Sequence, residues 1–112
     1  MTEWLEICPL EQIPRLGARV WPTPGGNISL FRASDDRVFA LADRCPHRGG
    51  PLSQGIVHGH YVTCPLHDFV IDLATGNAVA PDKGCTDIYP VRVEQGVVMI
   101  SLDRAKAAVE VA

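Results

Sequence analysis

Two short stretches, CPHRGG at 45–50 and CPLHDF at 64–69, constrain this chain more than any other feature of its sequence. Each holds a cysteine, a proline and a histidine within four residues, and no other cysteine lies among the eighteen residues between Cys45 and Cys64. Thiolates and imidazoles are common ligands of transition metals. The two stretches therefore predict one metal site made by two loops that follow neighbouring strands, with four candidate ligands: Cys45, His47, Cys64 and His67.

The spacing of these ligands bears on which metal they hold. A single residue separates Cys45 from His47, which is tighter than the two to four residues usual between the paired ligands of zinc fingers. Each loop supplies one sulfur and one nitrogen, so a site with two irons could place both thiolates on one iron and both imidazoles on the other. That is the Rieske arrangement of a [2Fe–2S] cluster. Zinc is the main alternative. A purely structural explanation without a metal is improbable, because two copies of Cys-Pro with a nearby histidine rarely arise by chance.

Composition and turn signals predict an all-β, antiparallel fold in a single domain, 1–112, whose cluster-binding part spans approximately 43–85. Ten glycines and nine prolines interrupt the chain, which favours short strands over long helices. Alternating or apolar runs flank turn sequences, which predicts hairpins. The expected strand pairs are 28–32 with 38–41, 56–57 with 61–63, and 91–94 with 97–100, with a further strand at 69–73. A short helix is expected only after Asp103.

Charge and hydropathy exclude several classes of partner. The formal net charge is −3 and the basic residues are scattered, so no basic stripe is present to follow a phosphate backbone and nucleic acid is not expected as a partner. The longest aliphatic run, Val97–Ile100, is far too short to cross a membrane, and residues 1–6 do not look like a signal peptide. We therefore expect a cytoplasmic protein with reduced thiols, whose cysteines are ligands rather than disulfide partners.

The stretches CPHRGGPLSQG and CPLH resemble the two cluster-binding loops of Rieske proteins. The resemblance implies a Rieske-type fold in which two Cys/His loops form a small subdomain around one [2Fe–2S] cluster per chain. High-potential members resemble C-x-H-x-x-C and C-x-C-H-G-S-x-Y, and their extra cysteines form a disulfide. Here Gly50 and Leu66 replace those cysteines, and Phe69 and Ile71 replace the serine and tyrosine that donate hydrogen bonds to sulfur. We expect a low reduction potential, about −150 mV or somewhat above.

The stretch GIVHGHYVTCPLHDFVIDLATGNAVAPDKGC is similar to the small subunit of assimilatory NAD(P)H-dependent nitrite reductase. This likeness extends from about Trp4 to Leu102 and is strongest from Cys45 to Cys85. It implies an oxidoreductase subunit that carries single electrons, has no catalytic residue of its own, and serves nitrate assimilation. The implied partner is a large subunit with FAD, sirohaem and a [4Fe–4S] cluster, which reduces nitrite to ammonia.

Two other functions stay open at this stage. One is a free Rieske ferredoxin serving an aromatic-ring or related oxygenase, although such ferredoxins look like C-P-L-H-G-G-R-F-D around the second loop. The other is a non-redox subunit whose site holds zinc or is purely structural. The absence of the G-G-R-F-D sequence after His67 favours the nitrite reductase resemblance over the ferredoxin.

Residues beside the ligands have weaker expected roles. Four of them are expected to surround the exposed edge of the cluster and to dock the partner: Pro46, Arg48, Pro65 and Leu66. Cys85 follows a proline-containing stretch that by resemblance covers the cluster, and we expect it to be a small buried residue. His58 and His60 are expected at a solvated turn, and Cys8 in an edge segment without a function.

Overall fold

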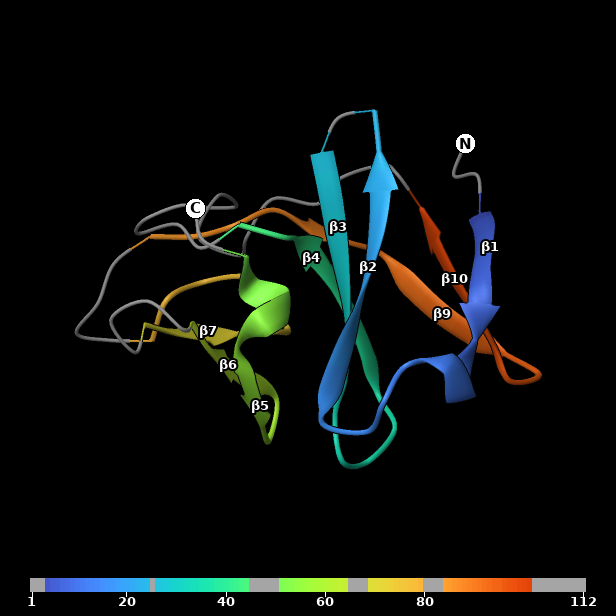
Figure 1. Cartoon of the computed structure of the whole chain (residues 1–112), viewed down its shortest axis with the longest axis horizontal. Coiled ribbons are helices and arrows are strands. Elements are labelled where there is room, and N and C mark those ends of the chain that lie inside the picture. Colours follow the sequence, from blue (N-terminus) through green and yellow to red (C-terminus); the bar gives the residue numbers. More distant parts are fainter. Residues whose placement is uncertain (1–3, 25, 45–50, 65–68, 80–83, 102–112) are drawn as a thin grey trace.

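The described residues of the chain form three antiparallel sheets, which confirms the predicted all-β fold. The computed structural model describes residues 4–24, 26–44, 51–64, 69–79 and 84–101. The first sheet has the order β1-β10-β9, the second β2-β3-β4-β8 and the third β5-β6-β7 (Figure 1). The strands and two short 3₁₀ helices are β1 (Trp4–Pro9), η1 (Leu10–Gln12), β2 (Gly17–Thr23), β3 (Gly26–Arg32), β4 (Val38–Ala42), η2 (Leu52–Gln54), β5 (Ile56–His58), β6 (Tyr61–Thr63), β7 (Val70–Asp72), β8 (Ile88–Tyr89), β9 (Val91–Glu94) and β10 (Val97–Ser101).

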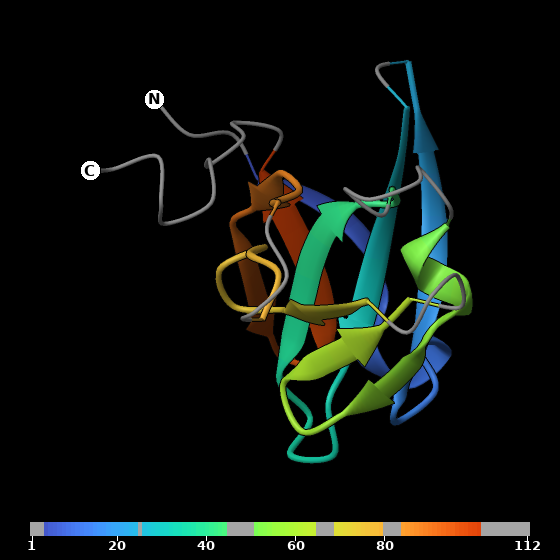
Figure 2. The ribbon, with the colours of Figure 1, turned by 90° about the vertical axis from the view of Figure 1, so that its left-hand side faces the viewer.

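The sheet β2-β3-β4-β8 lies between the other two and is covered on both faces (Figures 1 and 2). Neighbouring residues of a strand point to opposite faces, so one strand can supply two cores. On the β1-β10-β9 side, Ile28, Leu30 and Ala40 join what we call the far core. On the β5-β6-β7 side lies the site core, which consists of Phe31, Ala33, Phe39, Leu41, Leu52, Val57, Val62, Cys64, Phe69, Ile71 and Leu73.

The predicted hairpins form with the expected pairing. β3 pairs with β4, β5 with β6, and β9 with β10, all antiparallel. The turn between β9 and β10 has a positive φ at both Gln95 (53°) and Gly96 (77°), as a tight turn that matches the twist of two strands requires. The helix expected after Asp103 lies outside the described residues. Among the residues that are described, no helix is long and apolar enough to span a membrane.

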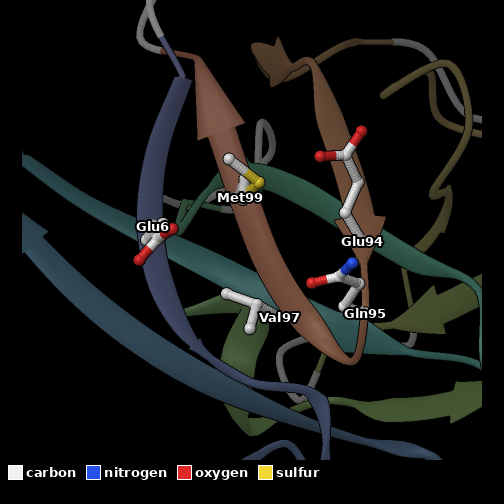
Figure 3. A pocket seen from close by; sticks show the side chains of 5 residues that line it. All are labelled: Glu6, Glu94, Gln95, Val97 and Met99. Carbon is white, nitrogen blue, oxygen red and sulfur yellow. The ribbon is translucent and has the colours of Figure 1, made fainter.

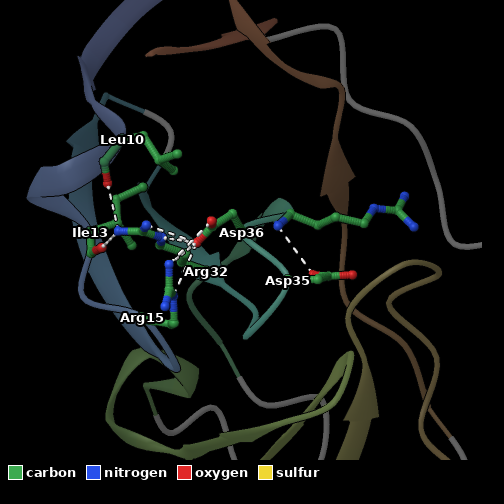
Figure 4. A network of polar contacts seen from close by, with 7 residues as sticks. Leu10, Ile13, Arg15, Arg32, Asp35 and Asp36 are labelled. Carbon is green, nitrogen blue, oxygen red and sulfur yellow. Dashed lines mark hydrogen bonds and ion pairs between the residues drawn. The ribbon is translucent and has the colours of Figure 1, made fainter.

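A partly buried arginine, Arg32, links η1 and the turn that follows it to the middle sheet (Figure 4). The Arg32 side chain is only 14% exposed, and its Nη1 donates to the carbonyl oxygen of Ile13 at 2.9 Å. Its Nε and Nη2 donate to Asp36 Oδ1 at 3.0 and 2.8 Å, and Arg15 binds the same carboxylate. The hydrogen bond from Arg32, ahead of that from Arg15, lowers the pKa of Asp36 below its ordinary value. Asp36 holds a positive φ of 70° within this network.

Replacing Arg32 with Leu should lower the free energy of unfolding by roughly 2 kcal/mol, because the Ile13 carbonyl loses its side-chain donor and the partly buried charge pair is broken. Chemical denaturation of the two proteins measures this difference. Arg37→Leu is the matched control, because the Arg37 side chain is exposed and only lies over the Phe39 ring. Equal losses of stability in the two variants would show that the Arg32 network does not hold the fold.

Candidate metal centre

Cys64 is the one candidate ligand that lies among the described residues. It follows directly after β6, has no exposed surface and packs in the site core. The other candidate ligands and the predicted docking residues lie outside the described part of the chain: Cys45, His47 and His67, with Pro46, Arg48, Pro65 and Leu66. Within the described part, no three side chains of His, Cys, Asp or Glu gather as a metal site. The four-residue ligand set therefore stays a prediction.

The second loop is closed at its base by a short backbone hydrogen bond. The N–H of Cys64 donates to the carbonyl oxygen of Phe69 at 2.7 Å, across residues 65–68. The strands on either side, β6 and β7, pair with Thr63 opposite Val70. The second stretch of the motif thus lies at the connection of a β-hairpin, whose two ends are joined by backbone hydrogen bonds.

Phe69 and Ile71 are buried in the same core as Cys64. Phe69 is 7% exposed and Ile71 has no exposed surface. Their side chains present only carbon to their surroundings, so they cannot donate the hydrogen bonds that raise the potential of high-potential Rieske proteins. The expected low reduction potential stays a prediction, and these two buried side chains are its structural basis.

The two Cys/His stretches follow strands of different sheets, so the expectation that their strands are neighbours was wrong. The first stretch follows β4 of the middle sheet, three residues after that strand ends at Ala42, and the second follows β6. The chain between them makes the connection, because Leu52 of η2 has no exposed surface and packs in the site core with Cys64. Packing of η2 in the site core, rather than pairing of β4 with β6, therefore links the described residues that flank the two stretches.

Gly55 permits this approach of η2 to β6. A Cβ atom at residue 55 would lie 2.3 Å from the carbonyl oxygen of Thr63 and 2.9 Å from Val62 Cγ2. Contacts that short with backbone do not occur, so any larger residue would push η2 away from the strand that ends beside Cys64. Residue 55 must therefore be a glycine, because no side chain fits between it and β6.

A third segment joins the end of β4. The N–H of Ala42 donates to the Asp87 carbonyl oxygen at 2.9 Å, and Thr86 Oγ1 donates to the Ala42 carbonyl oxygen at 3.3 Å. Opposite it, Gly76 has a φ of 78°, and a Cβ there would lie 2.4 Å from the Thr86 carbonyl oxygen. Residues 80–83, which by resemblance belong to a loop over the cluster, are outside the described residues, but both flanking segments are held in place.

Cys85 is exposed, so the expectation of a small buried residue was wrong. It lies in an isolated antiparallel bridge opposite Asn77, and its neighbour Thr86 is the buried residue of the pair. Alternation along the extended chain therefore turns residue 86 inward and residue 85 outward. Cys8 lies in the edge strand β1, as expected, and its side chain is buried. This burial raises the pKa of its thiol.

The two other histidines lie at the turn between β5 and β6, as expected. His58 is exposed, and its Nε2 lies 2.7 Å from Thr63 Oγ1. His60 Nε2 lies 3.0 Å from Asp35 Oδ2, and this hydrogen bond is the main reason that the pKa of Asp35 is lowered. The sequence did not suggest the contact from His60 to Asp35, which joins the turn after β3 to the turn after β5.

A hollow of about 580 Å³ lies on the β1-β10-β9 sheet, at the other side of the molecule from β5-β6-β7 (Figures 1 and 3). Its lining is Glu6, Glu94, Gln95, Val97 and Met99. Two carboxylates are too few for a metal site, and no histidine or cysteine lines it. It plays no part in the candidate centre.

The all-β frame and the buried thiol at the end of a hairpin strand are compatible with the iron–sulfur site that the paired Cys/His stretches predict. Residues 3–101 match the family model for a Rieske-like [2Fe-2S] domain, and the chain belongs to this family. Its cofactor is accordingly a Rieske [2Fe–2S] cluster. The chemistry of the donor set fits, because two thiolates and two imidazoles are the ligands of that cluster.

Three known proteins that are similar to this chain each cover about nine tenths of it. The ferredoxin component of a naphthalene 1,2-dioxygenase system from Pseudomonas aeruginosa is 32% identical, covering 91% of this chain and 99% of the relative. The solved structure of the E. coli protein NirD is 25% identical, with a TM-score of 0.79, and covers 92% of this chain and 99% of that one. A chain provisionally named as an NADH-dependent nitrite reductase small subunit, from Mycobacterium tuberculosis, has a TM-score of 0.80 at 21% identity, over 90% and 96% of the two chains, which shows the fold alone.

When bound, the cluster accepts and releases one electron. The described residues contribute three things to that chemistry. The site core keeps water away from Cys64, the hydrogen bond from Cys64 to Phe69 joins the residues on either side of 65–68, and Leu52 with Gly55 holds the segment that follows 45–50 against β6. A rigid surround of this kind limits the rearrangement that accompanies a change of charge.

Single replacement of Cys45, His47, Cys64 or His67 by Ala should abolish cluster binding, because each removes one of the bonds that hold the irons. Iron and sulfide content per chain and the visible absorption spectrum measure the loss. Cys8→Ala and Cys85→Ser are matched controls that should keep a full cluster. A variant that keeps all of its iron and sulfide would remove that residue from the ligand set.

Proposed function

We propose that this chain is the small subunit of an NAD(P)H-dependent nitrite reductase and carries electrons one at a time through its Rieske cluster. The observation that carries the proposal is the stretch from Cys64 to Cys85, where His67-Asp68-Phe69, Ile71-Asp72-Leu73, Gly76-Asn77-Ala78 and Pro81-Asp82-Lys83-Gly84-Cys85 resemble that family. In this role the chain has no catalytic residue of its own and works in the cytoplasm beside the large subunit.

The described part of that stretch has structural roles that support the likeness. Phe69, Ile71 and Leu73 fill the site core, and Gly76 makes the close approach to Thr86 that other residues cannot. The likeness to NirD over nearly the full length of both chains also supports the proposal. Several of the residues that carry the resemblance are thus residues of the site core.

Reduction of nitrite to ammonia consumes six electrons, whereas NAD(P)H delivers them in pairs. The proposed partner is a large subunit with FAD, sirohaem and a [4Fe–4S] cluster. A further one-electron site could store or pass electrons between these steps. The apolar, buried surroundings of Cys64 fit a cofactor that exchanges electrons with a partner protein and has no substrate of its own.

A free ferredoxin that serves an oxygenase is the second candidate. The 32% identity to the naphthalene dioxygenase ferredoxin, over 91% of this chain, supports it. The two candidates share the fold and the cluster, so the choice between them depends on the partner. We favour nitrite reductase because this chain has Asp68-Phe69 and Ile71 after His67, where the ferredoxins resemble G-G-R-F-D.

Purification of the tagged protein from its own organism, grown on nitrate or nitrite, separates the two candidates. A co-purifying large protein with sirohaem absorption and nitrite-dependent oxidation of NAD(P)H is the expected result. The control is the same purification from cells grown on ammonium. An isolated small protein with only an iron–sulfur spectrum would contradict the nitrite reductase assignment and favour the ferredoxin.

Partner docking is assigned to the residues beside the ligands: Pro46, Arg48, Pro65 and Leu66. Prolines and a leucine offer an apolar patch, and Arg48 adds a charge at its rim. Arg48→Glu should slow electron transfer from the partner by about tenfold or more at low salt while the visible spectrum stays unchanged, because rim charges mainly set the association rate.

Stopped-flow reduction by the purified partner measures this effect. The control is Arg92→Glu, which makes the same charge change on β9, in the sheet that lies away from β5-β6-β7 (Figure 1). If both variants are slowed equally, net charge alone explains the result and Arg48 has no special place in docking.

A further inference from the structure

One carboxylate fixes the two ends of the first ligand loop to each other. Asp43 Oδ1 accepts a hydrogen bond from the backbone N–H of Ser53 at 2.7 Å, and Asp43 Oδ2 accepts one from Ser53 Oγ at 2.9 Å. Both residues are half-buried. The segment between them, 44–52, contains the predicted ligands Cys45 and His47. Two short hydrogen bonds to one charged group are stronger than the same bonds between neutral groups.

Both ends of this bridge are themselves fixed to the fold. The backbone N–H of Asp43 donates to the Asn27 carbonyl oxygen of β3 at 2.9 Å. Ser53 lies in η2 between Leu52, which is fully buried in the site core, and Gln54. The Asp43 side chain therefore links the middle sheet to η2. In turn, η2 packs beside β6, the strand that Cys64 directly follows.

The bridge also meets a need of η2 that the chain does not meet locally. The first N–H groups of a short helix have no partner within it. Pro51, at the N-cap of η2, makes no side-chain hydrogen bond to this turn. Asp43 supplies the missing acceptor from ten residues earlier in the sequence, and its second oxygen binds the hydroxyl of the same serine. Such double use of one carboxylate is expected of a group that sets a position.

We propose that Asp43, acting through Ser53, is a positioning residue for the first ligand loop and sets the rate at which the cluster is lost and the geometry of its ligands. A loop whose ends are tied loses less conformational entropy when it closes on a metal. Groups that orient metal ligands from outside the ligand set typically change metal affinity by 10–100-fold when they are removed. The inference rests on Cys45 and His47 being ligands, and it does not depend on which enzyme the chain serves.

The test measures the cluster in the loaded protein. Asp43→Ala should lose its cluster about 10–100 times faster than the unmodified protein when the decay of visible absorption is followed with an iron chelator in excess. The electron paramagnetic resonance spectrum of the reduced cluster should shift or broaden, because the first loop adopts a wider range of ligand geometries. Ser53→Ala, which keeps the bond from the backbone N–H, should show a smaller change in the same direction.

Two further variants separate positioning from stability. Asp43→Asn should restore much of the unmodified behaviour, because its oxygen accepts from the Ser53 N–H and its amide donates to the Ser53 hydroxyl. Asp36→Asn weakens the Arg32 network, so it should lower the thermal midpoint while leaving the rate of cluster loss and the resonance spectrum unchanged.

The proposal is overturned if Asp43→Ala loses its cluster at the unmodified rate with an unchanged spectrum. It is also overturned if Asp36→Asn accelerates the loss by the same factor, because general destabilisation would then be the cause. If Asp43→Ala does not fold, Ser53→Ala decides, and an unchanged rate there contradicts the proposal. A cluster that survives in Cys45→Ala would instead show that the ligand assignment is wrong.

Discussion

Burial of the middle sheet on both faces is the constraint on which the rest of this structure depends. β3 and β4 send Ile28, Leu30 and Ala40 to one side and Phe31, Phe39 and Leu41 to the other. One pair of strands thus organises two cores, which a chain of 112 residues could not build as two separate domains. The β1-β10-β9 sheet completes the far core, and the β5-β6-β7 sheet can then be small because it needs only one buried face.

The candidate site is built where the site core meets three chain segments. The end of β4, the end of β6 and the segment at 84–87 are held by packing and by hydrogen bonds that involve backbone groups of Ala42, Cys64 and Thr86. Each segment leads into one of the stretches that carry or flank the predicted ligands. The frame therefore fixes where the loops begin and end, and we expect metal ligation to contribute to the folding of the segments between those points. This division fits the general coupling of metal binding to local folding.

The sequence was sufficient for the features that depend on local order. The hairpins at 28–41, 56–63 and 91–100 were predicted because alternating apolar residues flank recognisable turns. β2 was not predicted, although Pro24-Gly25-Gly26 is a turn signal, because Pro22 and Pro24 weaken the appearance of a strand. β2 tolerates proline because it is an edge strand of its sheet. The motif also predicted Cys64 as a ligand; the structure shows that Cys64 is buried, and its ligand role stays a prediction.

The contacts that could not be predicted from the sequence join residues far apart in the chain. Neither the contact of His60 with Asp35 nor the bridge from Asp43 to Ser53 follows from spacing, because each joins segments whose approach is set by the cores. The expectation of neighbouring strands for the two ligand loops failed for the same reason. Leu52 and Gly55 hold η2 against the site core and β6 through packing, and a buried leucine and a glycine in a turn have no distinctive pattern in sequence.

The same separation of frame and loops explains why fold and cofactor are easier to assign than the partner. The frame residues that position Cys64 are apolar or small, and they serve any partner that exchanges a single electron with the cluster. We expect partner choice to depend instead on the predicted docking side chains around the ligands, such as Arg48, and on the residues that follow His67. A change of partner would then alter side chains in the loops and leave both cores in place, which is why the shared frame identifies the family and not the partner.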